Sequence, residues 1–190
     1  FTNPADFGIN TEIYAYISFL NVILTYGMET AFFNFVTKNE NKNLVYSTAL
    51  ISLLSTTTLF MLIGYFSSGY IAGELGYTKN VNFIQWMVLI IASDAIMAIP
   101  FARLRAEQKP LRFAFVKMAN IFVNIGITIF FIHFCKKAYE QDLLNQSTST
   151  LGKLYDPQIG IGYAFLANLL ANVFSLLLLG KQFIGFSYTF

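Results

Sequence analysis

The chain has 190 residues, of which 56% are hydrophobic and only 12% are charged, about half the charged share of a soluble domain. This composition excludes an ordinary soluble domain, because a core of this size cannot bury so much apolar surface, and it excludes a disordered segment. The net charge of +2 excludes a strongly basic surface for nucleic acid, and the single cysteine, Cys135, excludes a disulfide framework and a cysteine-based zinc site.

Charged residues are nearly absent from five long stretches of the chain. A membrane-spanning helix needs about 20 mostly apolar residues. The sequence therefore predicts an all-α integral membrane protein with five transmembrane helices, near residues 13–36, 44–68, 82–102, 112–134 and 158–180. The polar segments between these stretches are predicted to be loops, the longest of them at 136–156. The alternative, five apolar helices burying one another in a soluble core, is disfavoured because none of them has a charged face.

The basic residues are distributed unevenly between the two sides that five spans define. Eight of the twelve fall on one side, namely Lys38, Lys42, Arg103, Arg105, Lys109, Arg112, Lys117 and Lys181. The positive-inside rule places that side, with residues 103–112, in the cytoplasm, and residues 1–11 and 136–156 outside it. A chain that starts outside without a signal sequence requires an earlier helix. Together with Phe1 in place of Met, this predicts a piece of a longer chain.

Two acidic residues lie inside the predicted spans, where a charge is costly unless it faces a cavity or a partner. Asn21, Thr25 and Glu29 are spaced four residues apart and therefore share one face of a helix. Asp94 lies past the middle of its own span. A polar cavity explains both acids. The alternatives are hydrogen bonds to a neighbouring helix, or a position of Glu29 close to the membrane interface.

Carboxamide side chains repeat this pattern on the fourth and fifth spans. Asn120 and Asn124 are four residues apart, and so are Asn168 and Asn172. For any one of them, an interhelical hydrogen bond worth roughly 0.6–2 kcal/mol explains the residue at least as well as a cavity. The recurrence on several helices favours a hydrated path for a polar solute.

Motifs of catalysis and metal binding are missing from the sequence. It has one histidine, His133, no H-E-x-x-H, no G-x-S-x-G nucleophile elbow and no P-loop. A zinc site needs three or four ligands. The sequence therefore predicts no catalytic residue, no metal site and no cofactor.

Two stretches resemble a known family. They are Leu24–Phe35, LTYGMETAFFNF, and Ala92–Phe115, ASDAIMAIPFARLRAEQKPLRFAF. Both look like the polysaccharide biosynthesis (oligosaccharide flippase) family of the multidrug/oligosaccharidyl-lipid/polysaccharide exporter superfamily, and the resemblance extends over the whole chain. It implies two six-helix lobes, with about twelve to fourteen helices in all, around a central cavity. Residues 1–190 are then most of the N-terminal lobe, helices two to six, and the second lobe of the same chain is missing.

The resemblance also implies a transporter and not an enzyme. Its members flip undecaprenyl-pyrophosphate-linked oligosaccharides, such as O-antigen, capsule or exopolysaccharide units, across the bacterial inner membrane by alternating access. The implied partners are this lipid-linked oligosaccharide and the membrane lipids. Family cavities are typically cationic, whereas this chain has Asn34 where relatives often carry a base, and no Lys or Arg is expected deep in a span.

The basic residues at the cytoplasmic mouth are therefore candidates for binding the pyrophosphate. Guanidinium groups match phosphate oxygens, and the candidates are Arg103, Arg105 and Arg112. The alternative is that these arginines only fix the topology and bind anionic lipid headgroups.

Glu29 or Asp94 is a candidate for coupling transport to a proton or a sodium ion, because a buried carboxylate can titrate. An acidic cavity also fits a second function, a cation-coupled multidrug antiporter of the same superfamily. A membrane enzyme is the third alternative. It requires catalytic residues on the 136–156 loop, which offers Glu140, Asp142 and Asp156 but no histidine.

Overall fold

The computed structural model describes residues 4–78, 80–145 and 149–184. Its elements are α1 (Pro4–Thr25), α2 (Met28–Lys38), α3 (Lys42–Phe66), α4 (Ser68–Glu74), α5 (Val81–Ala106), α6 (Pro110–Ile129), a π-helical stretch (Phe130–Cys135), α7 (Lys136–Asn145), a 3₁₀ turn (Gly152–Leu154) and α8 (Gly162–Ile184). Five helical segments of this part of the chain are long and apolar enough to cross a membrane, so the predicted fold class is confirmed.

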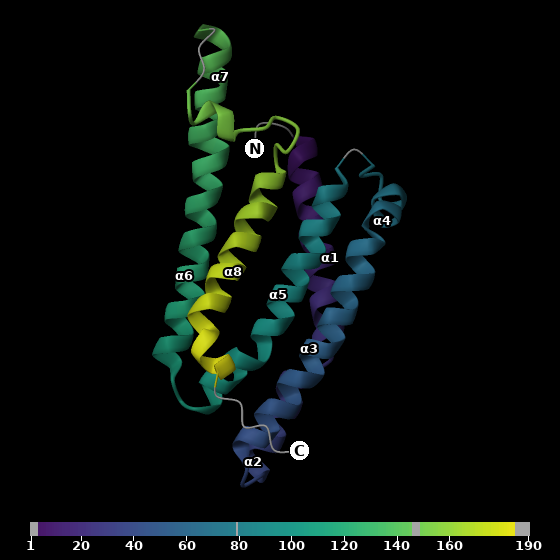
Figure 1. The fold of residues 1–190 in the computed structure, drawn as a ribbon, viewed down its shortest axis with the longest axis vertical. Coiled ribbons are helices and arrows are strands. Elements are labelled where there is room, and N and C mark those ends of the chain that lie inside the picture. Colours follow the sequence, from purple (N-terminus) through teal and green to yellow (C-terminus); the bar gives the residue numbers. More distant parts are fainter. Residues whose placement is uncertain (1–3, 79, 146–148, 185–190) are drawn as a thin grey trace.

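Helix α5 is the centre of the bundle. It packs against α1, α3 and α8, while α6 lies on the far side of α8 (Figure 1). Its side chains are buried on every face, with Ile84, Ile90 and Ile91 fully inaccessible. A helix that is apolar all round needs such a position. This segment therefore has almost no charge for two reasons: it is long enough to cross a membrane, and it lies at the core of the bundle.

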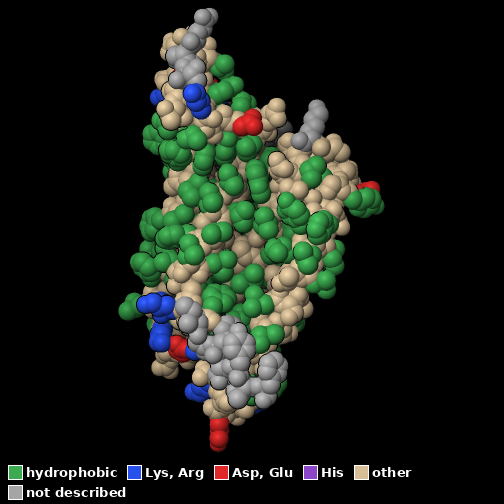
Figure 2. Space-filling model, in the orientation of Figure 1, with side chains coloured by type: hydrophobic (Ala, Val, Ile, Leu, Met, Phe, Trp, Pro, Cys, Tyr) green, Lys and Arg blue, Asp and Glu red, His purple; other side chains and the backbone are tan. Residues whose placement is uncertain are grey.

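The outer helices carry large apolar side chains on the surface. Phe19 is 66% exposed, Phe122 67% and Leu177 74%. In Figure 2, hydrophobic side chains cover the middle of the visible face, and charged side chains gather toward its two ends. Such a continuous apolar belt exceeds what soluble monomers expose, and it fits contact with lipid.

The first predicted span, 13–36, is not one continuous helix. Helix α1 ends at Thr25 and α2 begins at Met28. Between them, Tyr26 and Gly27 both have positive φ, 33° and 70°. Glycine adopts this left-handed conformation easily, whereas it strains a tyrosine. The backbone therefore changes direction at a two-residue joint inside the membrane-length segment Gly8–Lys38.

Two segments predicted to be loops contain helices. Helix α4 occupies part of 69–82, and α7 forms the first half of 136–156, continuing α6 and the π-helical stretch into a 36-residue rod, Pro110–Asn145. The loop prediction for 136–145 was wrong because polarity indicates solvent, not irregular backbone. The residues of α7 are mostly good helix formers, and Lys136 lies 3.9 Å from Glu140 one turn later.

A tyrosine joins this rod to the start of α8. Tyr163 is 3% exposed and stacks on Phe131, with ring centroids 4.6 Å apart. Its hydroxyl donates to the carbonyl of Leu154 at 3.1 Å and accepts from the backbone N–H of Asp156 at 2.8 Å. Two segments that the sequence connects by a polar loop are therefore held together by buried aromatic contacts.

Candidate functional site: a charged cavity in the helical bundle

A polar cavity of about 490 Å³ lies between α1, α2, α5 and α6, and we call it the charged cavity. Its lining consists of Ser18, Asn21, Val22, Thr25, Glu29, Asp94, Met97, Ala98, Phe101, Arg105, Phe113 and Lys117. It extends from Asp94, near the middle of α5, to Arg105 in the last turn of that helix. Two acidic and two basic side chains thus face one space between the helices that is open to the outside, since Lys117 is exposed and Arg105 and Glu29 are partly exposed.

The polar stripe predicted on the first span lines this cavity despite the break in the helix. Asn21 and Thr25 belong to α1, and Glu29 lies in the first turn of α2. The Thr25 hydroxyl donates to the backbone carbonyl of Asn21 at 2.9 Å, a bond within its own helix. The turn at Tyr26 and Gly27 keeps Glu29 on the same side as the other two residues.

An ion pair connects α2 to α5 in the charged cavity. Arg105 Nη2 lies 2.6 Å from Glu29 Oε1, and the two side chains are 39% and 41% exposed. The Arg105 guanidinium also lies 5.5 Å from the ring centroids of Phe33 and Phe113. The arginine predicted for the cytoplasmic mouth therefore faces the cavity, where its partner is one of the two predicted acids.

Lys117 is a cavity residue that the sequence reasoning missed. It lies within the membrane-length rod, and its ammonium group is 4.4 Å from the centroid of the Phe101 ring. The sequence assigns Lys117 only to the cytoplasmic side, and the structure adds that it lines the cavity. One signal was present in the sequence. Phe113 and Lys117, four residues apart, share a face of α6, and both line the cavity.

Carboxamides and hydroxyls connect Asp94 to two further helices. Asn172 Nδ2 donates to Asp94 Oδ1 at 2.9 Å and to Ser93 Oγ at 3.0 Å. Asn120 Nδ2 donates to Asn172 Oδ1 at 3.1 Å and to Ser175 Oγ at 2.9 Å. This chain of hydrogen bonds joins α5, α8 and α6 beside the charged cavity, and it fixes one face of the Asp94 carboxylate.

The other two carboxamides have separate partners. Asn168 Nδ2 donates to the hydroxyl of Tyr14, which connects α8 to α1 at 3.1 Å. Asn124 accepts from Thr128 Oγ1 at 3.3 Å within α6. Among the described residues that line the charged cavity there is no asparagine from α6 or α8. In the structure, Asn120, Asn168 and Asn172 make the interhelical hydrogen bonds that were the alternative to a hydrated path.

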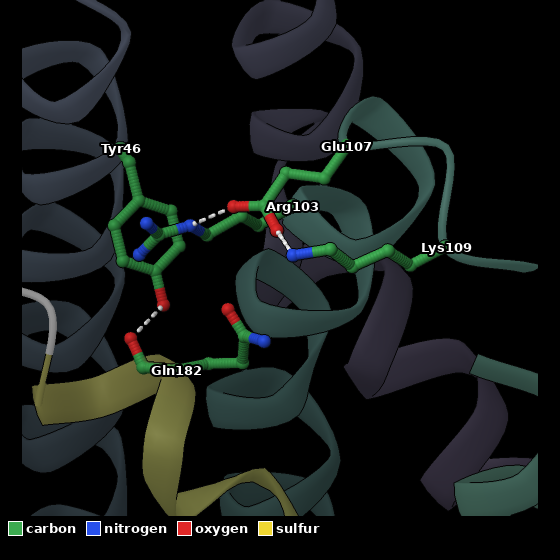
Figure 3. A network of polar contacts seen from close by, with 5 residues as sticks. All are labelled: Tyr46, Arg103, Glu107, Lys109 and Gln182. Atoms are coloured by element: carbon green, nitrogen blue, oxygen red, sulfur yellow. Dashed lines mark hydrogen bonds and ion pairs between the residues drawn. The ribbon is translucent and has the colours of Figure 1, made fainter. Parts of the chain in front are cut away.

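Arg103 faces away from the charged cavity, although it lies only two residues before Arg105. Two residues correspond to about 200° around an α-helix. Arg103 Nε donates to Glu107 Oε1 at 2.7 Å, and its guanidinium carbon is 4.3 Å from the centroid of the Tyr46 ring (Figure 3). Arg112 lies half-buried in the first turn of α6 and is not among the described residues that line either cavity.

The carboxylate of Glu107 has a second basic partner, Lys109 Nζ at 2.7 Å. Burial raises the pKa of Glu107, but the hydrogen bonds from Lys109 and Arg103 outweigh that effect and hold the pKa below its ordinary value. Glu107 is therefore ionised at neutral pH, and its charge is matched by two cations. Within the described ranges, no group of three or more His, Cys, Asp and Glu residues is placed to hold a metal ion.

Comparison with known proteins places this bundle in a family. The profile of a family described as polysaccharide biosynthesis protein matches residues 1–153, which include the whole described lining of the charged cavity and leave out α8. No curated protein and no solved structure matches the chain. With five helices able to cross a membrane, the chain is a multi-pass membrane protein that belongs to the polysaccharide biosynthesis protein family.

Proposed function

We propose that the chain forms part of a transporter that moves an undecaprenyl-pyrophosphate-linked oligosaccharide across the bacterial inner membrane by alternating access. The observation that carries the proposal is the charged cavity, where Arg105 and Lys117 face a space between membrane-length helices. Ionisable groups at such positions are costly and typically serve a solute pathway. Membership in the polysaccharide biosynthesis family supports a substrate that carries a glycan.

The cavity offers a match for each part of such a headgroup. Arg105 presents a planar fork that binds two phosphate oxygens at once, and Lys117 adds a point charge. Ser18, Asn21 and Thr25 place hydroxyl and carboxamide groups on the facing helix, where they are available to sugar hydroxyls. The prenyl chain stays in the lipid beside the bundle while the polar head crosses.

Substrate binding in this arrangement competes with the ion pair to Glu29. A pyrophosphate carries more negative charge than one carboxylate, so it displaces Glu29 from Arg105. Helix α2 then loses its ion pair to α5, and the apolar contacts of Phe32 and Val36 with α5 are left to resist a rotation about the joint at Tyr26 and Gly27. A ligand that binds the released state better shifts the population toward it. The released carboxylate is also the group we assign to coupling, with a proton or a sodium ion.

Export by the complete protein tests the proposal. In cells that lack their own copy, Arg105→Gln and Lys117→Gln are each expected to lower glycan export by at least about tenfold, because each removes a charged hydrogen-bond donor for the phosphate. Lys181→Gln is the matched control, since it removes an exposed charge at the same end of the bundle. Wild-type export by both cavity variants, at equal protein levels, rules the proposal out.

A cation-coupled multidrug antiporter is the second candidate, because Glu29 and Asp94 both line the cavity. The two bases that face the same space favour a substrate with a phosphate. Glu29→Gln separates the two functions. Loss of drug resistance with glycan export intact favours the antiporter, and glycan export that is unchanged across pH and sodium concentration removes Glu29 from coupling in the flippase.

A further inference from the structure

A second cavity lies on the opposite side of α5, between α2, α3 and α5, and we call it the Arg103 pocket. It has a volume of about 630 Å³ and shares no described lining residue with the charged cavity. Its polar lining includes Arg103 and Glu107 from the end of α5, Lys42 and Asn43 from the start of α3, and Thr37 from α2.

Arg103 is fixed on one side and unsatisfied on the other. Its Nε donates to Glu107, and its guanidinium carbon lies 4.3 Å from the centroid of the Tyr46 ring (Figure 3). Tyr46 is fixed in turn, because its hydroxyl donates to the carbonyl of Gln182 at 3.1 Å. Nη1 of Arg103 is buried and has no hydrogen-bond partner among the described residues. A buried charged donor without an acceptor is costly, so Arg103 gains from an oxygen acceptor in the pocket that its side chain lines.

The charge of the pocket selects an anion. Glu107 is already matched by Arg103 on one oxygen and by Lys109 on the other, both at 2.7 Å. Lys42 lines the pocket and is an exposed residue. A phosphate oxygen suits the guanidinium of Arg103, and the Lys42 charge, the Asn43 carboxamide and the Thr37 hydroxyl lie around the same space.

The position of the pocket brings it to the level of lipid headgroups. Lys42 is the first residue of a membrane-length helix, and Arg103 lies in the last turn of another. The start of α3 and the end of α5 lie at the end of the bundle shown at the bottom of Figure 1. Basic pockets between transmembrane helices at this level bind lipid phosphates. We propose that the Arg103 pocket binds a phosphate group, as a lipid phosphodiester or a free phosphate, at a site separate from the charged cavity.

Ligand-induced stabilisation of the complete purified protein tests this site, since a ligand that binds only the folded state raises Tm. The probes are phosphatidylglycerol, phosphatidylcholine and inorganic phosphate, each titrated in detergent. We expect phosphatidylglycerol to raise Tm more than phosphatidylcholine does. Lys42→Gln and Arg103→Gln are each expected to weaken the apparent affinity by at least about tenfold, and Lys181→Gln is expected to leave it unchanged.

Each outcome decides the matter. If inorganic phosphate raises Tm with the same dependence on Lys42 and Arg103, the site is confirmed with a soluble phosphate as its source. If neither substitution weakens the binding of any probe, or if Lys181→Gln weakens binding as much as they do, the proposed site is ruled out. Should Arg103→Gln fail to fold, Lys42→Gln decides alone, because that side chain is exposed. Glycan export is governed by other residues, so the two proposals fail independently.

Discussion

The charged cavity and the Arg103 pocket share the end of α5 but differ in where their arginines find a partner. Arg105 pairs with Glu29 on a different helix, whereas Arg103 pairs with Glu107 one turn further along its own helix. An ion pair between helices breaks when the helices separate. An ion pair within one helix survives such a movement. The comparison indicates that the Glu29–Arg105 pair depends on how α2 and α5 lie relative to each other, whereas the Arg103–Glu107 pair does not.

The largest expected effect comes from reversing the charge of one partner in the interhelical pair. Glu29→Arg alone places two guanidinium groups together and is expected to abolish glycan export by the complete protein. Arg105→Glu alone has the same expected effect. The double variant with both substitutions restores the pair and a cation in the cavity, so export is expected to recover substantially. A double variant no better than the single ones contradicts a role for the pair in linking α2 to α5.

The next prediction separates the two arginines. Arg105→Gln is expected to lower glycan export by about tenfold or more and to leave phosphatidylglycerol affinity unchanged. Arg103→Gln is expected to lower that affinity and to reduce export less than Arg105→Gln does. Both variants are measured in the same preparations, for export in cells and for Tm in detergent. Equal effects of both variants on both readouts contradict a division between two sites.

A smaller effect is expected at the wall of the charged cavity. Asn172→Ala removes the amide nitrogen that donates to Asp94 and Ser93 and the amide oxygen that accepts from Asn120. Buried groups left without a partner cost about 1–3 kcal/mol each. We expect a lower free energy of unfolding for the complete protein in detergent. Asn124→Ala is the matched control, because the hydrogen bond from Thr128 lies within one helix. Equal destabilisation by both variants argues against the chain of hydrogen bonds between helices.

The smallest effect concerns pH at the Arg103 pocket. The pKa of Glu107 is lowered on folding, so the folded state binds fewer protons than the unfolded state. Its contribution is therefore present above the ordinary glutamate pKa of about 4.3 and is lost as the pH falls below that value through the lowered pKa. For a partly exposed pair this amounts to at most about 1 kcal/mol. The Tm difference between wild type and Glu107→Gln is expected to vanish on acidification, and a constant difference contradicts the prediction.

Much of the fold was predictable because a membrane imposes a simple rule on the sequence. Stretches without charge must be long enough to cross it, and the five spans follow from that length. The break at Gly27 was not predicted, since glycine is common inside membrane helices and only the backbone conformation distinguishes a joint from a packing contact.

The candidate site was predictable in its acids but not in its bases. Glu29 and Asp94 attract attention because a carboxylate inside a span needs a partner, and both line the cavity. Arg103 and Arg105 were predicted together as pyrophosphate-binding candidates at the cytoplasmic mouth, and Lys117 was assigned only to that side of the membrane. Neither prediction says which face of a helix each residue occupies. The helical period separates Arg103 from Arg105 by about 200°, and that argument was available from the sequence alone.

A small tilt of the long rod formed by α6, the π-helical stretch and α7 displaces its α7 end by a large distance. At 1.5 Å per residue, its 36 residues extend for about 54 Å, well beyond a hydrocarbon layer of about 30 Å. Lys117 lies near one end of this rod, and Glu140 lies near the other. A tilt of about 10° about Lys117 moves the far tip, about 42 Å away, by roughly 7 Å. A spectroscopic label on α7 is therefore displaced further than the cavity residues are, so its movement reports a tilt of the rod at the charged cavity from the other end of the bundle.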